Sequence, residues 1–126
     1  MRVLIIDDNI RFRATMRQLF TAFGHSVVEA VTVTSVHAPL GKDLFDLVVA
    51  QLHDTERSAA MIMAIRAQSP IPLLFIGRRG APEIPGQFTG LAESINAPFC
   101  IDDLSGRIAA LMIRHSEFAR FHAALR

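Results

Sequence analysis

The stretch DLVVAQLHD, residues Asp46 to Asp54, narrows the fold more than any other part of the sequence. Leu47 to Ala50 are consecutive apolar residues, and such a run favours a strand that is buried on both faces of a parallel sheet. Gln51 follows at the carboxyl end of this strand, where a neutral amide can only form hydrogen bonds. The stretch therefore predicts a central strand that ends in a side chain without nucleophilic chemistry.

Similar apolar runs lie on both sides of this stretch. Strands are expected at residues 3–6, 27–30, 47–50, 73–76 and 93–95. Helices are expected between Asn9, a good cap, and Gly24, at 58–68, and from about Asp102 to the end, with a weaker candidate at 32–40. Strands that alternate with helices predict an α/β fold, a doubly wound five-stranded parallel sheet. Gly77 to Gly90 is rich in helix breakers and predicts little regular structure.

Composition limits the class of protein. The 126 residues are 51% apolar and 20% charged, which indicates one globular domain. The formal net charge of +1 gives no reason to expect direct nucleic-acid binding. Cys100 is the only cysteine, so an intrachain disulfide is excluded and a buried or half-buried thiol is expected. Acids at positions 7 and 8 argue against a signal peptide, and no apolar run could span a bilayer, so we expect a cytoplasmic protein without membrane contact.

Several polar or small residues follow the predicted strands directly. In a parallel sheet, the carboxyl ends of the strands meet at one edge, where such domains place their functional crevice. The residues at that edge are Asp7 and Asp8, Gln51, Gly77, and Asn96 with Ala97. We therefore expect these side chains to lie close together.

Over residues 1 to about 114, the sequence resembles the receiver domain of two-component response regulators, the CheY-like or flavodoxin-like fold. The resemblance rests on LIIDDN, Gly24, FDLVVAQL, IPLLFIG, and the APF of residues 97–99. It implies a site in which an acidic pair holds magnesium and an aspartate accepts a phosphoryl group. It also implies a hydroxyl and a lysine that hold the phosphoryl oxygens.

Only the metal-binding half of that site is present. Asp7 and Asp8 match the acidic pair, but Gln51 stands at the acceptor position, Gly77 at the hydroxyl position and Ala97 at the lysine position. Three losses remove the nucleophile, the hydroxyl and the counter-charge together. The resemblance therefore predicts a non-enzymatic pseudo-receiver that is not phosphorylated, with no cofactor beyond weak magnesium binding.

Alternatives remain open for the residues around this site. Asp54 is either a substitute phosphoacceptor or the cap of the following helix. His53 either joins Asp7 and Asp8 in a transition-metal site or is an exposed loop histidine. The acidic pair itself could simply cap the next helix and favour its dipole.

Arg78 and Arg79 form a pair of cations in the loop after the fourth strand. Paired arginines can grip phosphate, so the emptied pocket could sense a small anion or a nucleotide such as a cyclic dinucleotide. The alternative is that both are ordinary solvated loop residues.

The last helix carries an apolar seam with alternating spacings of four and three. Its members are Leu104, Ile108, Leu111, His115, Phe118, His122 and Leu125. The first positions are needed for packing within residues 1–114, whereas residues 115–126 lie beyond the usual end of a receiver. We expect this extension, with Leu111 at its start, to mediate homodimerisation or to lead into a C-terminal output domain, such as a DNA-binding, kinase or cyclase domain. The alternative is a frayed tail.

Overall fold

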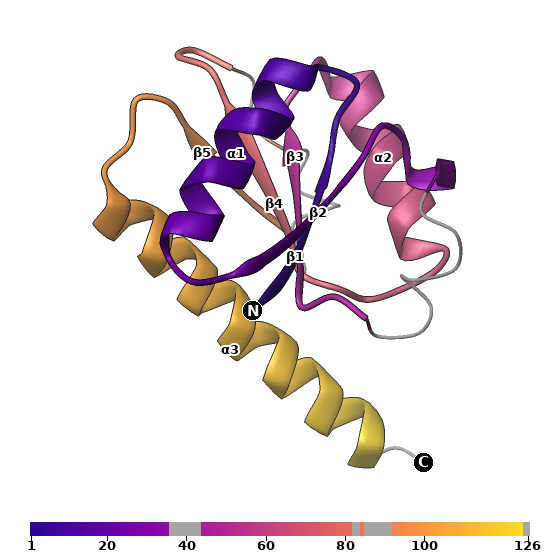
Figure 1. Cartoon of the computed structure of the whole chain (residues 1–126). Coiled ribbons are helices and arrows are strands. Elements are labelled where there is room, and N and C mark those ends of the chain that lie inside the picture. Colours follow the sequence, from indigo (N-terminus) through magenta and orange to yellow (C-terminus); the bar gives the residue numbers. More distant parts are fainter. Residues whose placement is uncertain (36–43, 82–83, 85–91, 125–126) are drawn as a thin grey trace.

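A parallel sheet of five strands forms the centre of the structure, with the strand order β2-β1-β3-β4-β5 (Figure 1). The strands are β1 (Arg2–Ile6), β2 (Ser26–Ala30), β3 (Leu47–Gln51), β4 (Leu73–Gly77) and β5 (Ala92–Asn96). The computed structural model describes residues 1–35, 44–81, 84 and 92–124. The predicted doubly wound fold is confirmed, and each predicted strand differs from the observed one by one residue at one or both ends.

Strand β3 lies at the middle of the sheet, between β1 and β4. Val48 is in register with Leu4 on one side and with Leu73 on the other. Leu47 to Ala50 are all 0% exposed, because helices cover both faces of the sheet. This burial explains why the run is apolar throughout and does not alternate with polar residues.

In the described part of the chain, three α-helices and one short 3₁₀ helix surround the sheet (Figure 1). They are α1 (Ile10–Ala22), α2 (Thr55–Arg66), α3 (Ile101–Ala124) and the 3₁₀ helix η1 (Val33–Ser35). Side chains of α1 and α3 share one core cluster with one face of the sheet, while those of α2 join a second cluster on the opposite face. Among the described residues, no helix is both long and apolar enough to cross a membrane.

Local signals explain where α1 begins and ends. The Asn9 side chain accepts hydrogen bonds from the backbone N–H groups of Arg11 and Phe12, which caps the helix as predicted. Gly24 follows the helix with a φ of +84°, a conformation that glycine adopts without steric cost. Met16 and Phe20 face the core, whereas Phe23 at the C-cap is 53% exposed.

Some expectations from the sequence are wrong or fall outside the described residues. Helix α2 begins at Thr55, three residues before Ser58, because Asp54 caps it. Cys100 is exposed rather than buried, since it precedes α3 on the surface. Of the helix candidate at 32–40, only the η1 turn is described, and most of Gly77–Gly90 lies outside the described residues.

Helix α3 is continuous from Ile101 to Ala124, so the predicted extended C-terminal helix is confirmed. Leu104 and Leu111 are buried against the sheet, and Ile108 packs beside them. His115 is half-buried, but the side chains of the later seam positions, Phe118, His122 and Leu125, lie outside what the structure describes. The helix passes the end of the sheet and extends beyond it (Figure 1).

Ion pairs fasten the edge strand β2 to α1. Glu29 accepts from Arg17 Nε at 2.5 Å and from Arg13 Nε at 3.3 Å. The hydrogen bond from Arg17 is the main cause that lowers the pKa of the Glu29 carboxyl from its ordinary value of 4.5. A carboxyl with a lowered pKa stabilises the fold above the pKa of the unfolded chain, and this stabilisation is lost as the pH falls through the folded value.

We therefore expect Glu29→Gln to destabilise the protein at pH 7 by about 0.5–1 kcal/mol, because Arg17 is partly exposed to solvent. The variant should also lose less stability than the wild type when the pH falls below about 4.5. Urea denaturation at neutral and acidic pH measures both effects. Glu117→Gln, which removes an exposed carboxyl on α3, is the control and should leave the acid dependence unchanged. Identical pH profiles for wild type and Glu29→Gln would contradict the prediction.

Candidate functional site

Asp7 is the most constrained residue at the carboxyl edge of the sheet. It is 2% exposed, and its carboxylate accepts from the backbone N–H of Asn9 at 2.8 Å and lies 2.7 Å from His53 Nε2. Arg13 Nη1 donates to the carbonyl oxygen of Asp7 at 2.7 Å. A buried carboxylate requires such partners, because it has lost its contacts with water. Asp7 therefore joins the end of β1, the start of α1 and the loop after β3.

His53 and Arg57 both contact the acidic pair, Asp7 and Asp8. Arg57 Nη2 donates to Asp8 at 3.3 Å, and Arg57 Nη1 lies 3.4 Å from His53 Nδ1. Because an arginine can only donate, His53 Nδ1 accepts, and Nε2 is then the atom that donates to Asp7. The alternative of an exposed loop histidine is wrong, since His53 is half-buried and hydrogen-bonded to Asp7.

These contacts bear on whether the acidic pair can hold a metal ion. Ligand atoms of Asp7, Asp8 and His53 lie within 4.8 Å of one another. Magnesium prefers several oxygen ligands, yet Asp7 and Asp8 are the only carboxylates of this cluster, and His53 and Arg57 already contact both. The permanent charge of Arg57 also opposes a second cation at this place. The residues present therefore fit magnesium poorly.

Asp54 serves as the N-cap of α2. Its carboxylate accepts from the backbone N–H of Arg57 at 2.8 Å, which satisfies one of the free donors at the start of the helix. This contact also fixes the turn from which the Arg57 side chain reaches Asp8. The structure thus shows the capping role that the sequence left open for Asp54.

The three altered positions of the implied phosphorylation site line one pocket of about 520 Å³. Gln51 lies at the end of β3, and Gly77 and Ala97 lie beside each other, with the Ala97 N–H donating to the Gly77 carbonyl oxygen at 2.6 Å. The first turns of α1 and residues 97–99 complete the wall. Gln51 is part of this wall, and its Oε1 atom is buried without a hydrogen-bond partner among the described residues.

Packing against β5 explains why a glycine fits at position 77, which the sequence alone did not reveal. A Cβ built on Gly77 would lie 2.1 Å from Oδ1 of Asn96, its register partner on β5. The Asn96 side chain thus occupies the space where a serine or threonine would begin. A hydroxyl cannot be restored at Gly77 unless Asn96 moves. Only the register of β4 and β5 brings these two residues together.

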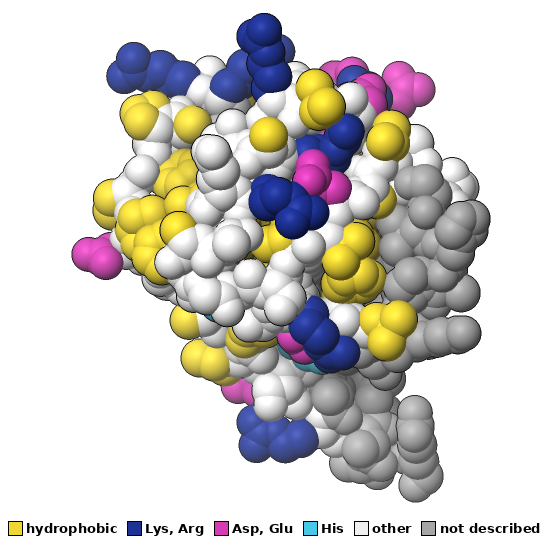
Figure 2. Space-filling view, in the orientation of Figure 1, with side chains coloured by type: hydrophobic (Ala, Val, Ile, Leu, Met, Phe, Trp, Pro, Cys, Tyr) yellow, Lys and Arg dark blue, Asp and Glu magenta, His cyan; other side chains and the backbone are white. Residues whose placement is uncertain are grey.

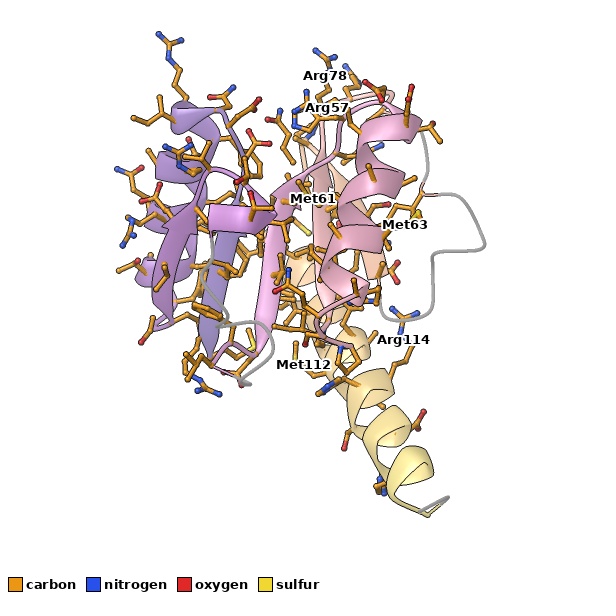
Figure 3. All side chains as sticks on the ribbon, turned by 90° about the vertical axis from the view of Figure 1, so that its right-hand side faces the viewer. Arg57, Met61, Met63, Arg78, Met112 and Arg114 are labelled. Carbon is orange, nitrogen blue, oxygen red and sulfur yellow. The ribbon has the colours of Figure 1, made fainter. Side chains whose placement is uncertain are left out.

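The two loop arginines are exposed but occupy different positions relative to this pocket. Arg78 lines it, whereas Arg79 is absent from its wall, and Arg11 of α1 supplies the second cation there. Arg57 and Arg78 lie at the same end of the domain (Figure 3). Arginine side chains also gather at the upper end of the face seen in Figure 2. The sequence pointed to Arg78 but not to Arg11.

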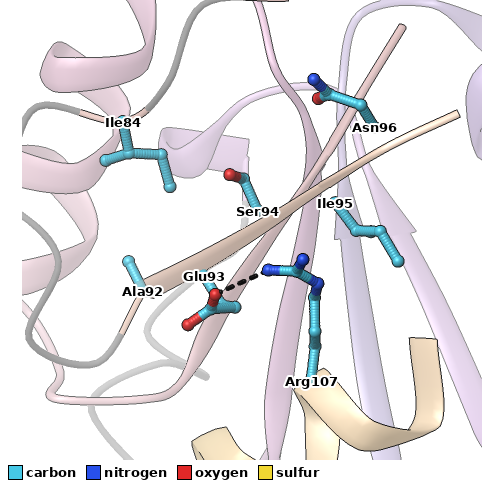
Figure 4. A pocket seen from close by; sticks show the side chains of 7 residues that line it. All are labelled: Ile84, Ala92, Glu93, Ser94, Ile95, Asn96 and Arg107. Carbon is cyan, nitrogen blue, oxygen red and sulfur yellow. Dashed lines mark hydrogen bonds and ion pairs between the residues drawn. The ribbon is translucent and has the colours of Figure 1, made fainter. Parts of the chain in front are cut away.

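A second pocket, of about 470 Å³, lies beside β5 and the start of α3 (Figure 4). Its polar wall includes Glu93, which accepts from Arg107 at 2.9 Å and also from Arg114 at 2.9 Å. Both arginines belong to α3, so Glu93 anchors the helix to the edge strand. Because its carboxylate is engaged twice by cations of the chain, we assign this surface a structural role.

We expect Arg57→Ala to strengthen magnesium binding by about two- to fivefold, because an exposed ion pair opposes the metal by no more than about 1 kcal/mol. The affinity is measured by following the backbone amide of Asp8 by NMR during a titration with magnesium chloride. Arg79→Ala changes the net charge equally but leaves the acidic pair untouched, so it should bind like the wild type. An equal gain in both variants would attribute the effect to net charge.

Comparisons with known proteins agree with this architecture. Aerobic respiration control protein ArcA of Escherichia coli strain K12 is 26% identical over 115 residues, which cover 89% of this chain and 48% of ArcA. The chain thus spans about half the length of this curated relative. No family model matches the chain.

Solved structures support the fold. NtrX from Brucella abortus, solved in complex with ADP, superposes with a TM-score of 0.72 at 23% identity, over 100% of this chain and 29% of NtrX. A CheY-like receiver domain from Methanospirillum hungatei superposes with a TM-score of 0.65 at 19% identity, over 88% of this chain and 93% of that domain. The chain thus has the CheY-like fold of these receiver domains, and its sequence is similar to about half of ArcA.

Proposed function

We propose that this chain is a pseudo-receiver, a signalling domain that acts through protein contacts and is not phosphorylated. One observation carries the proposal: Gln51, Gly77 and Ala97 line a single pocket and offer no nucleophile, no hydroxyl and no ammonium group. A receiver needs all three groups in one place to capture a phosphoryl group. Their combined loss leaves a scaffold without catalytic residues. We place this module in the bacterial cytoplasm, within a two-component-type pathway.

The contacts of the acidic pair support the same function. In a phosphorylated receiver, a metal ion would balance these carboxylates. Here Arg57 and His53 contact Asp8 and Asp7 within the chain itself. The guanidinium of Arg57 thus offsets part of the negative charge at this edge without a metal. Any magnesium that binds does so weakly and without a role in phosphotransfer.

We expect the wild-type protein to gain no phosphoryl group when it is incubated with acetyl phosphate and magnesium. Gln51 is not a nucleophile, and Asp54 is held by the start of α2. Intact-mass spectrometry checks the result, with a phosphorylatable receiver as the positive control for the reagent. A mass gain of one phosphoryl group that Asp54→Asn abolishes would overturn the proposal and assign the acceptor to Asp54.

Helix α3 supports a role in association. Among the side chains that the structure describes, Leu111 is the last fully buried one of this helix, and the helix continues to Ala124 (Figures 1 and 3). Ile113, beyond Leu111, is 61% exposed. A helix that leaves its own domain gains stability from a partner, since short isolated helices are marginal in water. We propose homodimerisation through this extension, or its continuation into an output domain, because ArcA is about twice as long.

We expect the chain to be a dimer at neutral pH and a chain that ends at Arg114 to be a monomer. Removal of residues 115–126 leaves Leu104, Leu111 and the Arg114 contact with Glu93 in place, so the domain should stay folded. Light scattering gives the mass of both forms, and circular dichroism verifies folding. A monomer in both cases would exclude dimerisation, and a dimer in both cases would place the interface on the domain itself.

Ligand sensing is a second candidate function, favoured by the position of Arg78 on the wall of the altered pocket. Arg79 gives it no support, since it is not among the residues that line the pocket. In this function, occupancy of the pocket by a small anion replaces phosphorylation as the input.

A further inference from the structure

We propose that the pocket lined by Gln51, Gly77 and Ala97 binds a small organic anion with a flat apolar body and an N–H or O–H donor. The proposal rests on the pseudo-receiver function, because the ligand occupies space that the phosphorylation groups would otherwise share. Three parts of the pocket wall recognise three features of this ligand. The pocket's volume of about 520 Å³ is that of a site for a small molecule.

The apolar part of the wall determines the body of the ligand. Met16 and Ile76 are nearly fully buried, and the half-buried rings of Phe12 and Phe99 lie nearer the surface. These four residues come from α1, from β4 and from the segment after β5, and Pro98 adds another apolar surface. Aromatic and aliphatic walls of this kind favour a flat or branched hydrocarbon group over a hydrated ion.

The charged part of the wall determines the sign of the ligand. Arg11 and Arg78 line the pocket, and no acidic residue is found among the described residues around it. Within the described part of the chain, neither guanidinium forms an ion pair, whereas Arg13, Arg17 and Arg57 each contact a carboxylate. Two exposed and uncompensated guanidinium groups beside an apolar floor favour a carboxylate or phosphate ester.

Gln51 determines the third feature of the ligand. Its Oε1 atom is buried and has no hydrogen-bond partner in the described structure. A buried acceptor without a donor is unfavourable, and such atoms are uncommon in folded proteins. A rotation of the side-chain amide would turn Oε1 toward the pocket, where a ligand N–H or O–H would satisfy it. The amide that stands at the implied phosphoacceptor position would thus take part in binding the ligand.

Asp7 and Asp8 are not part of the pocket wall. Arg57 contacts the carboxylate of Asp8, and His53 contacts that of Asp7. The altered pocket therefore presents a positive rim to an incoming ligand. A bound anion would touch both the start of α1 and the segment just before α3, so it would lie next to the helix proposed to mediate association.

The test uses indole-3-acetate as the probe, because it combines a flat ring, a carboxylate and an N–H donor. We expect saturable NMR shifts of the backbone amides of Gly77, Arg78 and Phe99 in the whole chain. Indole-3-acetamide, which lacks the charge, and naphthalene-1-acetate, which lacks the N–H, should each bind about tenfold more weakly. Inorganic phosphate, which lacks the apolar body, should cause no saturable shifts.

Matched variants assign the contacts. Arg78→Gln should weaken the probe by about tenfold, while Arg79→Gln, its exposed neighbour outside the pocket, should bind like the wild type. Gln51→Leu should remove the preference for indole-3-acetate over naphthalene-1-acetate. Thr15→Phe, on the exposed side of α1 and on the pocket wall, should block binding of every probe.

Several outcomes would overturn the proposal. They are the absence of saturable shifts, equal weakening by Arg78→Gln and Arg79→Gln, full binding by a folded Thr15→Phe variant, and equal shifts with inorganic phosphate. Arg78→Gln carries the test even where another variant unfolds, because Arg78 is exposed and forms no ion pair in the described structure. The acetyl phosphate experiment is independent: a phosphoryl gain overturns the pseudo-receiver function, whereas failure of every probe overturns only the ligand.

Discussion

The buried carboxylate of Asp7 is the constraint on which this end of the molecule depends. Because Asp7 is only 2% exposed, its carboxylate has almost no contact with water, so the surrounding chain must supply its hydrogen-bond partners. The N–H of Asn9 and the ring of His53 contact the carboxylate, and the Asp7 N–H donates to Ala30 at the end of β2. The side chain and backbone of Asp7 together connect three strand ends and the start of α1.

The carboxyl edge of the sheet has two halves, which differ in how their polar side chains are paired. In the half that contains Asp7 and Asp8, Arg57 and His53 of the same chain contact the carboxylates. In the half that contains Gln51, an amide, a glycine and an alanine line a pocket, and the amide oxygen has no hydrogen-bond partner among the described residues. Under the proposed function, the first half keeps its contacts without a phosphoryl group, and the second half offers room for a ligand.

Helix α3 begins near this edge of the sheet and extends beyond the sheet (Figure 1). It starts directly after residues 97–99 of the pocket wall, packs through Leu104 and Leu111, and is fastened to β5 by the two arginines on Glu93. The helix is continuous from Ile101 to Ala124, so it joins the pocket wall directly to the part that extends beyond the sheet. This arrangement makes α3 the element through which pocket occupancy could alter association.

The sequence by itself determined the sheet, because the apolar run Leu47–Ala50 requires burial on both faces, and Asn9 and Gly24 act on their own backbone. It also placed Gln51, Gly77 and Ala97 at one edge, since the carboxyl ends of parallel strands must meet there. Only the tertiary structure decided which side chains touch: Arg57 with Asp8, His53 with Asp7, Asn96 with Gly77, and Arg11 with the pocket. The reason is that strand formation and capping are set within a few residues, whereas these contacts join distant segments. Their geometry depends on register, helix position and side-chain direction, which packing alone fixes.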